Sequence, residues 1–242
     1  MIDGAIRIAH SILTLPSYRR TLKRRARRDT SIDEHLRTAF ECRSGPLYIM
    51  PYQVPSEIKA LLELVASRSC ARVLEIGSSK GGTIYLFSRV SSPQATLVTV
   101  DLPGSLLRGH YPRWKDSLYR SFAGDGQTLV PMRGDSHTPG TSARVFDALG
   151  RQPVDFLFID GDHSYDGAKD DFERYRKLVT PNGIIAFHDV VPGPAEMVGG
   201  VPQLWQELKQ QYTHRELVES WTQGGFGIGV LEDAGTFQPT SV

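Results

Sequence analysis

The sequence predicts one α/β domain built on a doubly wound, mostly parallel sheet. Apolar runs typical of strands occur near residues 72–77, 96–101, 128–133, 155–160 and 183–188, and helical patterns follow near 82–90, 139–149 and 166–178. Strands that alternate with helices in this way indicate a parallel sheet covered on both faces. A glycine-rich turn joins the first of these strands to its helix, and open α/β sheets bind their ligands at such turns.

Residues 1–43 are predicted to form a helical, basic extension ahead of this region. Residues 5–15 can form a short amphipathic helix, which Pro16 either ends or follows as the start of the next helix. Seven of the ten residues from Arg19 to Arg28 are Lys or Arg, and six of the seven share one half of a helical wheel. We interpret them as a solvated face that covers the domain or an oligomer partner. Contact with an anionic membrane or with nucleic acid stays open.

Residues 44–55 contain three prolines and are predicted to be an ordered loop. A helix is expected from Ser56 to the strand at 72–77, because apolar residues recur there at helical spacing. Four residues of the loop are expected to form one wall of a pocket: Tyr48, Met50, Tyr52 and Gln53. After the last parallel strand, Trp205 and the loop at 192–203 are expected to form a lid. Strands near 215–220 and 226–231 complete the domain, and residues beyond Asp233 are polar and expected to be disordered.

The composition is that of an ordinary globular protein with one core. Of the 242 residues 40% are apolar and 23% charged, and the net charge of +1 provides no global field for nucleic acid. Cys42 and Cys70 lie far apart and are expected to be free thiols. No apolar run approaches the roughly 18 residues of a membrane span. A leader would place positive charge before its apolar region, whereas Asp3 comes first here, so a cytoplasmic protein is expected.

The turn at Gly77–Gly82 indicates a site for a nucleoside cofactor. Glycines at 77, 81 and 82 allow a sharp bend and a close approach to a ligand. A dinucleotide loop has the pattern GxGxxG, and Ser79 breaks it. The pattern ExGxxxGG, from Glu75 to Gly82, instead resembles motif I of the class I S-adenosylmethionine-dependent methyltransferases. The resemblance implies a cofactor site at Gly77, Ser78, Gly81 and Gly82, with Glu75 near the ammonium group of the cofactor.

The next two strands also end in polar residues. Asp101 closes its strand and can accept both ribose hydroxyls of a nucleoside. Its alternative role is to cap the turn that follows it. The third strand leads into Gly134-Asp-Ser-His137, and similarity to catechol-type methyltransferases implies that Ser136 and His137 contact adenine. The alternative is ordinary turn chemistry, since Gly-Asp-Ser is a common loop string.

A second group of polar residues follows the last two predicted parallel strands. Asp160, Asp162 and His163 come after one strand, and His188 and Asp189 end the next. Adjacent parallel strands bring their carboxyl ends to one rim, so Asp160, Asp189 and His188 can converge on a divalent ion. Oxygen ligands favour Mg²⁺, and a histidine ligand also admits Mn²⁺, Fe²⁺ or Zn²⁺. In the alternative interpretation these carboxylates orient backbone or cofactor groups without an ion.

Residues 50–231 resemble a branch of the family that includes metal-dependent O-methyltransferases of catechols and macrolide sugars. Asp160 and His163 have the Asp-x-x-His spacing of the macrolide-sugar enzymes, in which the Asp is a metal ligand and the His is a general base. The resemblance also implies that Asp160 contacts the cofactor here. His188-Asp189 replaces the acidic pair, or the Asp-Asn pair, of those relatives. The resemblance implies a Rossmann-like sheet of seven strands in a domain spanning 44–233, followed by a polar tail at 234–242.

The sequence therefore predicts an O-methyltransferase that uses S-adenosyl-L-methionine, with help from a Mg²⁺ or Mn²⁺ ion. His163 would be the general base, because an unperturbed histidine takes up a proton near neutral pH. The expected acceptor is a hydroxyl of a small molecule or glycoside. The alternatives are a nicotinamide-dependent oxidoreductase, and a non-catalytic cofactor-binding subunit or membrane-surface adaptor. Peripheral membrane contact through Arg19–Arg28 and a homo-oligomer stay open.

Overall fold

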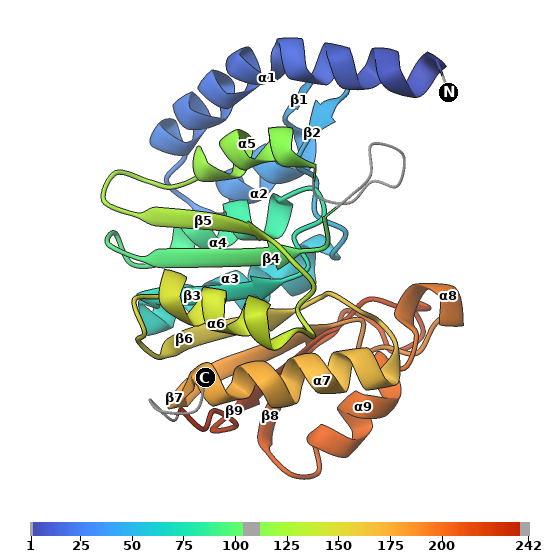
Figure 1. Ribbon diagram of the computed structural model, residues 1–242. Helices are drawn as coiled ribbons and strands as arrows, with labels where there is room; N and C mark the ends of the chain where they lie inside the picture. The colour runs from blue at the N-terminus through green and yellow to red at the C-terminus, as the bar shows by residue number, and fades with distance from the viewer. Residues whose placement is uncertain (1, 104–111, 238–242) are drawn as a thin grey trace.

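The computed structural model describes residues 2–103 and 112–237, with side chains described from residue 8 onward. Its centre is a seven-stranded sheet in the order β5-β4-β3-β6-β7-β9-β8 (Figure 1). The strands are β3 (Arg72–Ile76), β4 (Thr96–Asp101), β5 (Thr128–Arg133), β6 (Val154–Ile159), β7 (Val179–His188), β8 (Thr213–Leu217) and β9 (Ile228–Glu232). Neighbouring strands from β5 to β7 are parallel, whereas β9 runs antiparallel to β7 and to β8. This confirms the predicted fold class.

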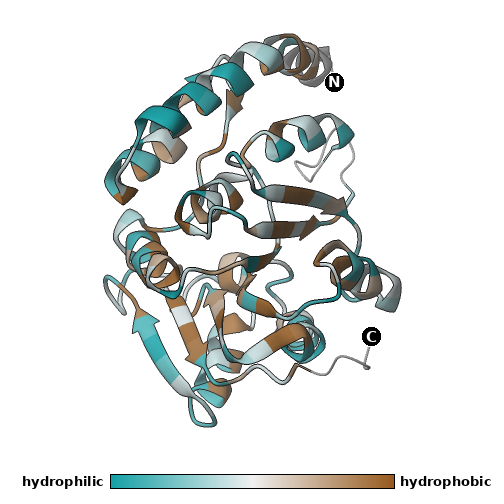
Figure 2. Cartoon of the chain, turned by 90° about the vertical axis from the view of Figure 1, so that its left-hand side faces the viewer, coloured by the Kyte–Doolittle hydropathy of each residue, from teal (hydrophilic) through white to brown (hydrophobic). Residues whose placement is uncertain are grey.

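Helices cover both faces of the sheet, and each face has its own apolar core. One core joins the sheet to α1 (Ile2–Arg28), α2 (Ile32–Glu41), α3 (Pro55–Arg68), α4 (Gly82–Val90) and α5 (Asp116–Arg120). The other joins it to α6 (Pro139–Ala148), α7 (Tyr165–Tyr175) and α9 (Val201–Leu208). Apart from the exposed edge strand β8, the sheet strands are largely apolar in Figure 2, as expected for strands buried on both sides. The short elements are β1 (Arg43–Ser44), β2 (Leu47–Tyr48), α8 (Ala195–Val198) and two 3₁₀ turns, Arg113–Lys115 and Arg176–Leu178.

The sheet order places a ligand crevice between β3 and β6. Successive strands run outward from β3 to β5 in one direction and from β6 to β7 in the other. Connections on opposite faces separate at this point, and the space beyond the carboxyl ends of the two strands is left open. The glycine turn follows β3 and Asp160 follows β6, so both predicted sites lie at this crevice.

The amino-terminal region differs from the sequence prediction in two places. Pro16 neither ends nor starts a helix, because α1 continues through it from Ile2 to Arg28. Pro16 is exposed, so water can hydrate the carbonyl group that its missing N–H leaves free, while Leu15 and Tyr18 on the other side are buried in the core. The expected loop at 44–55 includes strand β2, which pairs with β1 as a short hairpin. The extension is thus packed against the first core.

The carboxyl-terminal tail also differs from the prediction. Ala234 is fully buried, and the backbone N–H groups of Thr236 and Phe237 donate to the carbonyls of Arg176 and Val179. The residues at 234–237 are therefore ordered along the second core, because an alanine and an aromatic ring cover it. Residues 238–242 lie outside the described part of the chain. Both cysteines are buried free thiols.

Candidate active site

The glycine turn fits tightly against the end of β6. Gly77 has a φ of 91°, and a Cβ atom at this position would lie 1.9 Å from the carbonyl oxygen of Asp160. Gly81 has a φ of 86°, and a Cβ atom there would lie 2.5 Å from the ring of Tyr119. Both positions therefore need glycine for conformation and for space. The turn and the start of the Asp160 loop form one continuous rim at the β3/β6 crevice.

Asp101 holds this turn from the neighbouring strand. Its Oδ2 accepts hydrogen bonds from the backbone N–H of Ser78 at 3.1 Å and of Ser79 at 2.7 Å, and from the Ser78 hydroxyl at 3.2 Å. Asp101 is partly exposed, whereas Ser78 is buried. The carboxylate thus fixes the shape of the turn and also faces the crevice, so it can bind a ligand hydroxyl there.

Glu75 does not lie at the rim, which corrects the prediction that it meets the cofactor ammonium group. Its side chain is fully buried, and its Oε2 accepts the hydroxyl hydrogen of Thr99 at 2.5 Å. Side chains alternate along a strand, so Glu75 points to the same face as Val73, into the core beneath α4. Oε1 has no hydrogen-bond partner among the described residues. Burial raises the pKa of Glu75 to about 8, against the opposing effect of hydrogen bonds from Thr83 and Thr99.

The predicted adenine segment follows β5 and is anchored from α7. The Tyr175 hydroxyl donates to the carbonyl oxygen of Ser136 at 2.9 Å, and the His137 N–H donates to Asp135 at 2.9 Å. His137 Nε2 lies 3.5 Å from Oδ1 of Asp171, which is fully buried. Burial raises the pKa of Asp171 to about 6.

Asp171 was not predicted as a site residue. The available signal was its position on the apolar face of α7, where Ala168, Phe172 and Tyr175 are buried with it at helical spacing. An acidic residue in such a stripe needs a polar partner. His137 approaches it at 3.5 Å, but neither carboxylate oxygen of Asp171 has a hydrogen-bond partner among the described residues.

Four charged side chains gather where β6 and β7 end. Single ligand atoms of Asp160, His163 and Asp189 all lie within 4.8 Å of one another. His163 Nε2 is 3.5 Å from Asp160 Oδ1, and its Nδ1 is 3.3 Å from Asp189 Oδ2. His188 Nδ1 is 3.3 Å from Asp160 Oδ1 and 3.4 Å from Asp189 Oδ1. The structure thus brings together the predicted Asp160, His188, Asp189 and His163, and leaves the exposed Asp162 to cap the next turn by accepting the Ser164 N–H at 2.8 Å.

The two histidines differ in accessibility. His188 is buried below the two carboxylates, whereas the side chain of His163 is 37% exposed. Hydrogen bonding to Asp160 raises the pKa of His163 to about 9 despite partial burial. Burial lowers the pKa of His188, but Asp160 and Asp189 outweigh burial and raise it to about 10. Burial would raise the pKa of Asp160, but the two histidines lower it to about 2.

These residues fit a divalent cation. Two carboxylates and neighbouring imidazoles form a donor set suited to Mg²⁺, Mn²⁺ or Fe²⁺. Without a cation, two imidazolium protons balance the two carboxylates, and metal binding replaces such protons. Asp189 itself has a φ of 62° and accepts the backbone N–H of Phe226 at 3.2 Å. This left-handed backbone turns its carboxylate into the cluster.

Part of the predicted pocket wall reaches the cluster. Gln53 is buried and donates to Asp160 Oδ2 at 2.8 Å, and its Oε1 has no partner among the described residues. The ammonium group of Lys80, in the glycine turn, lies 4.4 Å from the ring centroid of Tyr48 and 4.0 Å from that of Tyr52. Met50 instead accepts a contact from Arg43 at 3.8 Å. Tyr48, Tyr52 and Gln53 therefore border the crevice from the 44–55 segment.

Trp205 is not part of a lid, which corrects a second expectation. Its ring is 1% exposed, lies 6.3 Å from that of Phe187, and donates its indole N–H to Glu216 at 2.9 Å. The apolar face of α9 buries it in the second core. The segment before α9 does reach the site, because the Met197 carbonyl oxygen is hydrogen-bonded to His163 Nδ1.

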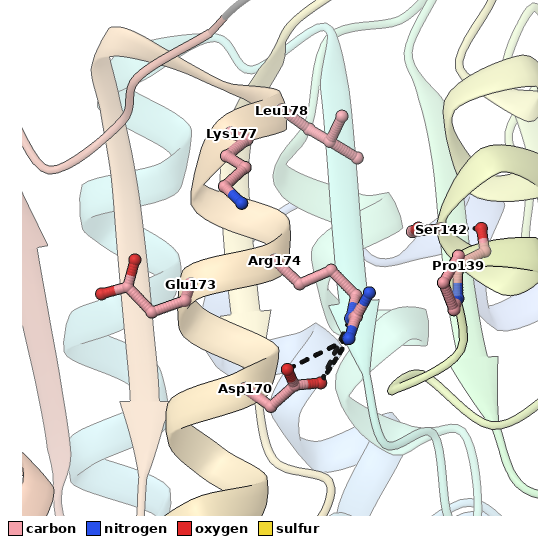
Figure 3. A pocket seen from close by; sticks show the side chains of 7 residues that line it. All are labelled: Pro139, Ser142, Asp170, Glu173, Arg174, Lys177 and Leu178. Atoms are coloured by element: carbon pink, nitrogen blue, oxygen red, sulfur yellow. Dashed lines mark hydrogen bonds and ion pairs between the residues drawn. The ribbon is translucent and has the colours of Figure 1, made fainter. Parts of the chain in front are cut away.

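A separate hollow of about 270 Å³ lies between α6 and α7, away from the crevice (Figure 3). Asp170 and Arg174 form a charged pair there, with oxygen–nitrogen distances of 2.8–3.1 Å. Glu173 and Lys177 also line it, so its charges are mixed and already partly paired. None of the predicted site residues lines this hollow.

Comparison with known proteins places this geometry in a wider context. Residues 74–190 match a protein family described as a methyltransferase domain. The uncharacterized protein y4gI of Sinorhizobium fredii is 27% identical over 139 residues, which are 57% of this chain but 15% of that protein. The chain therefore corresponds to only a small part of this relative.

Two crystal structures share the fold. An O-methyltransferase of Bacillus cereus, in complex with S-adenosylhomocysteine, is 20% identical and has a TM-score of 0.56, covering 84% of this chain and 91% of its own. The O-methyltransferase TomG of Streptomyces achromogenes, involved in tomaymycin synthesis and in complex with S-adenosylmethionine, is 21% identical with a TM-score of 0.56, covering 84% and 90%. At these identities the likeness establishes the fold.

Proposed function

We propose that this chain is a class I S-adenosylmethionine-dependent methyltransferase that methylates a hydroxyl group of a small or glycosylated acceptor, a proposal supported by the matched methyltransferase domain and by the fold. The observation that carries the proposal is the position of the Asp160–His163–Asp189 cluster beside the glycine turn. A Cβ atom on Gly77 would collide with the Asp160 carbonyl, so the two features share one rim. A cofactor held by the turn would therefore lie next to groups that can bind and deprotonate a hydroxyl.

The proposed cofactor site follows the crevice from β5 to β6. The turn from Gly77 through Ser78 to Gly81 and Gly82 would approach the amino-acid end of S-adenosylmethionine through its backbone. Asp101 faces the crevice beside this turn, where it can accept ribose hydroxyls. Ser136 and His137, anchored by Tyr175 and Asp171, would border the adenine. Asp160 contributes its backbone at the junction of the two loops.

The reaction asks the protein mainly for alignment and for the transfer of one proton. The methyl group of a sulfonium cofactor is already activated, so holding it in line with an acceptor oxygen provides much of the rate enhancement. A hydroxyl group becomes a good nucleophile when it loses its proton. His163 is the accessible histidine of the cluster, and we assign it the role of general base.

Asp160 and Asp189, with His188 beneath them, are the residues that would hold a divalent cation. Such a cation supplies positive charge that lowers the pKa of a bound hydroxyl. With two imidazolium groups facing the carboxylates, His163 carries a proton at neutral pH, as the direction of its pKa shift indicates. Neutralisation of the carboxylates by another positive charge is therefore what would free His163 to accept a proton.

The test compares three variants in three assays. Calorimetry should detect binding of S-adenosylhomocysteine to the wild-type protein, and conversion of S-adenosylmethionine should require an acceptor from a phenol and glycoside library. His163→Ala should abolish turnover while Mn²⁺ affinity, followed by electron paramagnetic resonance, changes by no more than a few fold. Asp189→Asn should lower Mn²⁺ affinity at least about tenfold, since it removes a charged ligand. His214→Ala, an exposed histidine on β8, is the matched control.

Each outcome bears on a separate part of the proposal. Failure to bind S-adenosylhomocysteine would overturn the methyltransferase function of the crevice. Loss of Mn²⁺ binding in His163→Ala would show that His163 is a ligand and would remove it as the base. Full turnover after exhaustive chelation would exclude the role of the cation.

A further inference from the structure

We propose that the outer face of α1 is a docking surface for an anionic lipid membrane. Five basic side chains form a continuous exposed stripe, which we call the basic stripe: Arg20, Lys23, Arg24, Arg27 and Arg28. Their spacing of three and four residues places them on one side of the helix. In Figure 2 the polar colour gathers on this carboxyl-terminal half of α1.

The helix is firmly seated, so the stripe has a fixed orientation. On its inner side Leu15, Tyr18 and Leu22 are 7%, 0% and 1% exposed and belong to the first core. The Tyr18 hydroxyl also donates to the Cys42 carbonyl at 2.9 Å. Because the inner face is fixed, the basic side chains project away from the sheet.

The charge of α1 is opposite to that of the remaining chain. The helix contains eight of the 28 Lys and Arg residues and one of the 27 Asp and Glu residues. This leaves 20 basic and 26 acidic residues, a net charge of −6, for the rest of the chain. An anionic surface would therefore attract α1, repel the body and orient the molecule.

Little within the described structure neutralises the basic stripe. Arg27 approaches Asp125 at 3.7 Å, but the two side chains are 76% and 95% exposed. An exposed pair of this kind is weak and screened by salt. Arg28 is more firmly engaged, because it pairs at 2.9 Å with Asp29, whose side chain is buried. Arg20, Lys23 and Arg24 have no ion pair among the described residues, so their charge is available to a partner.

Exposed apolar side chains favour a lipid surface over other polyanions. Ile12 and Leu13 are 47% and 79% exposed and continue the outer face of α1 toward its amino-terminal half. A helix with basic and large apolar residues on its outer face can bury the apolar ones among acyl chains while the basic ones meet phosphates. A nucleic acid offers no apolar environment in which Leu13 could be buried. A symmetric contact with a second copy of the chain would place the two basic stripes against each other, where their charges repel.

A cleft at the edge of the basic stripe fits a lipid phosphate. It has a volume of about 180 Å³ and lies between α1 and the α4–α5 side. Its lining includes three basic residues, Lys23, Arg27 and Arg89, and one acidic residue, Asp125. Tyr85 also lines it, and its hydroxyl is buried with no hydrogen-bond partner among the described residues. Within the described residues no helix is long and apolar enough to cross a bilayer, so the contact would be peripheral.

Vesicle sedimentation of the full chain tests the proposal. The protein should bind vesicles of phosphatidylcholine with one quarter phosphatidylglycerol, bind pure phosphatidylcholine at least about tenfold more weakly, and lose affinity as salt rises from about 0.05 to 0.5 M. Arg20→Ala/Arg24→Ala should lower the partition coefficient about 30-fold, at ~1 kcal/mol per basic residue. Leu13→Ser should lower it at least about fivefold through lost apolar burial.

The matched control removes two exposed basic residues on the opposite face of the sheet. Arg144→Ala/Lys177→Ala gives the same change in net charge at α6 and at the 3₁₀ turn that follows α7, and it should leave vesicle binding within about twofold. Circular dichroism confirms that each variant is folded, and the salt series on the wild type needs no variant. Equal binding to both vesicle types, or equal loss in the control pair, would overturn the proposal. So would tighter binding to a nucleic acid duplex than to the anionic vesicles.

Discussion

Glu75 makes the stability of this protein depend on pH in a way that one substitution can isolate. The side chain is fully buried, and burial raises its pKa from 4.5 to about 8. Between these values the native protein binds a proton that the unfolded chain has released. The contribution of this proton to the free energy of unfolding is therefore fully present below about pH 4.5. It decreases as the pH rises and is lost above about pH 8.

The size of the effect follows from the pKa difference. A shift from 4.5 to about 8 corresponds to about 5 kcal/mol at 1.36 kcal/mol per pKa unit. Glu75→Gln keeps the shape of the side chain and removes the titration. At pH 5 the variant should differ from the wild type by no more than about 1 kcal/mol, and at pH 8.5 it should be more stable by about 3 to 5 kcal/mol.

Urea unfolding followed by tryptophan fluorescence, at several pH values and without added cofactor, measures this difference. Other groups that titrate in the same window, such as Asp171, affect both proteins and cancel in the comparison. Glu63→Gln, on the exposed side of α3, is the control and should leave the curve unchanged. Parallel stability curves for the wild type and Glu75→Gln would refute the reasoning, because they would mean that Glu75 is ionised in the folded core.

Two further predictions concern the cofactor turn and α1. Asp101→Asn should weaken S-adenosylhomocysteine binding at least about tenfold in calorimetry, since charged acceptors make the stronger hydrogen bonds. The control is Asp125→Asn, which changes a side chain that is 95% exposed and should leave the affinity unchanged. Equal affinity in the wild type and Asp101→Asn would remove Asp101 from the cofactor site. Pro16→Ala should raise the free energy of unfolding by about 1 to 3 kcal/mol, because it restores an N–H that can donate to the Ile12 carbonyl within α1. A lower melting temperature for this variant would contradict the account of Pro16 as a tolerated interruption.

Much of the fold could be predicted because strands buried on both faces leave a clear record in sequence. The runs at 96–101 and 128–133 coincide with β4 and β5, and the expected helix at 82–90 coincides with α4. These elements are short, apolar and bounded by turn residues, so local pattern decides them. Pro16 and the residues at 234–237 were assigned wrongly because burial against distant elements, not local propensity, orders them there.

Within the candidate site, the sequence by itself determined which residues stand at the ends of strands. Gly77, Asp101, Asp160 and Asp189 follow from the order of strands and turns, because parallel strands end at one rim. Only the tertiary structure decided where their neighbours point. Alternation along β3 turned Glu75 into the core, α7 brought Asp171 to His137, and the 44–55 segment laid Gln53 on Asp160. Such contacts join segments that are far apart in the chain, and spacing along a sequence carries no measure of distance through a folded core.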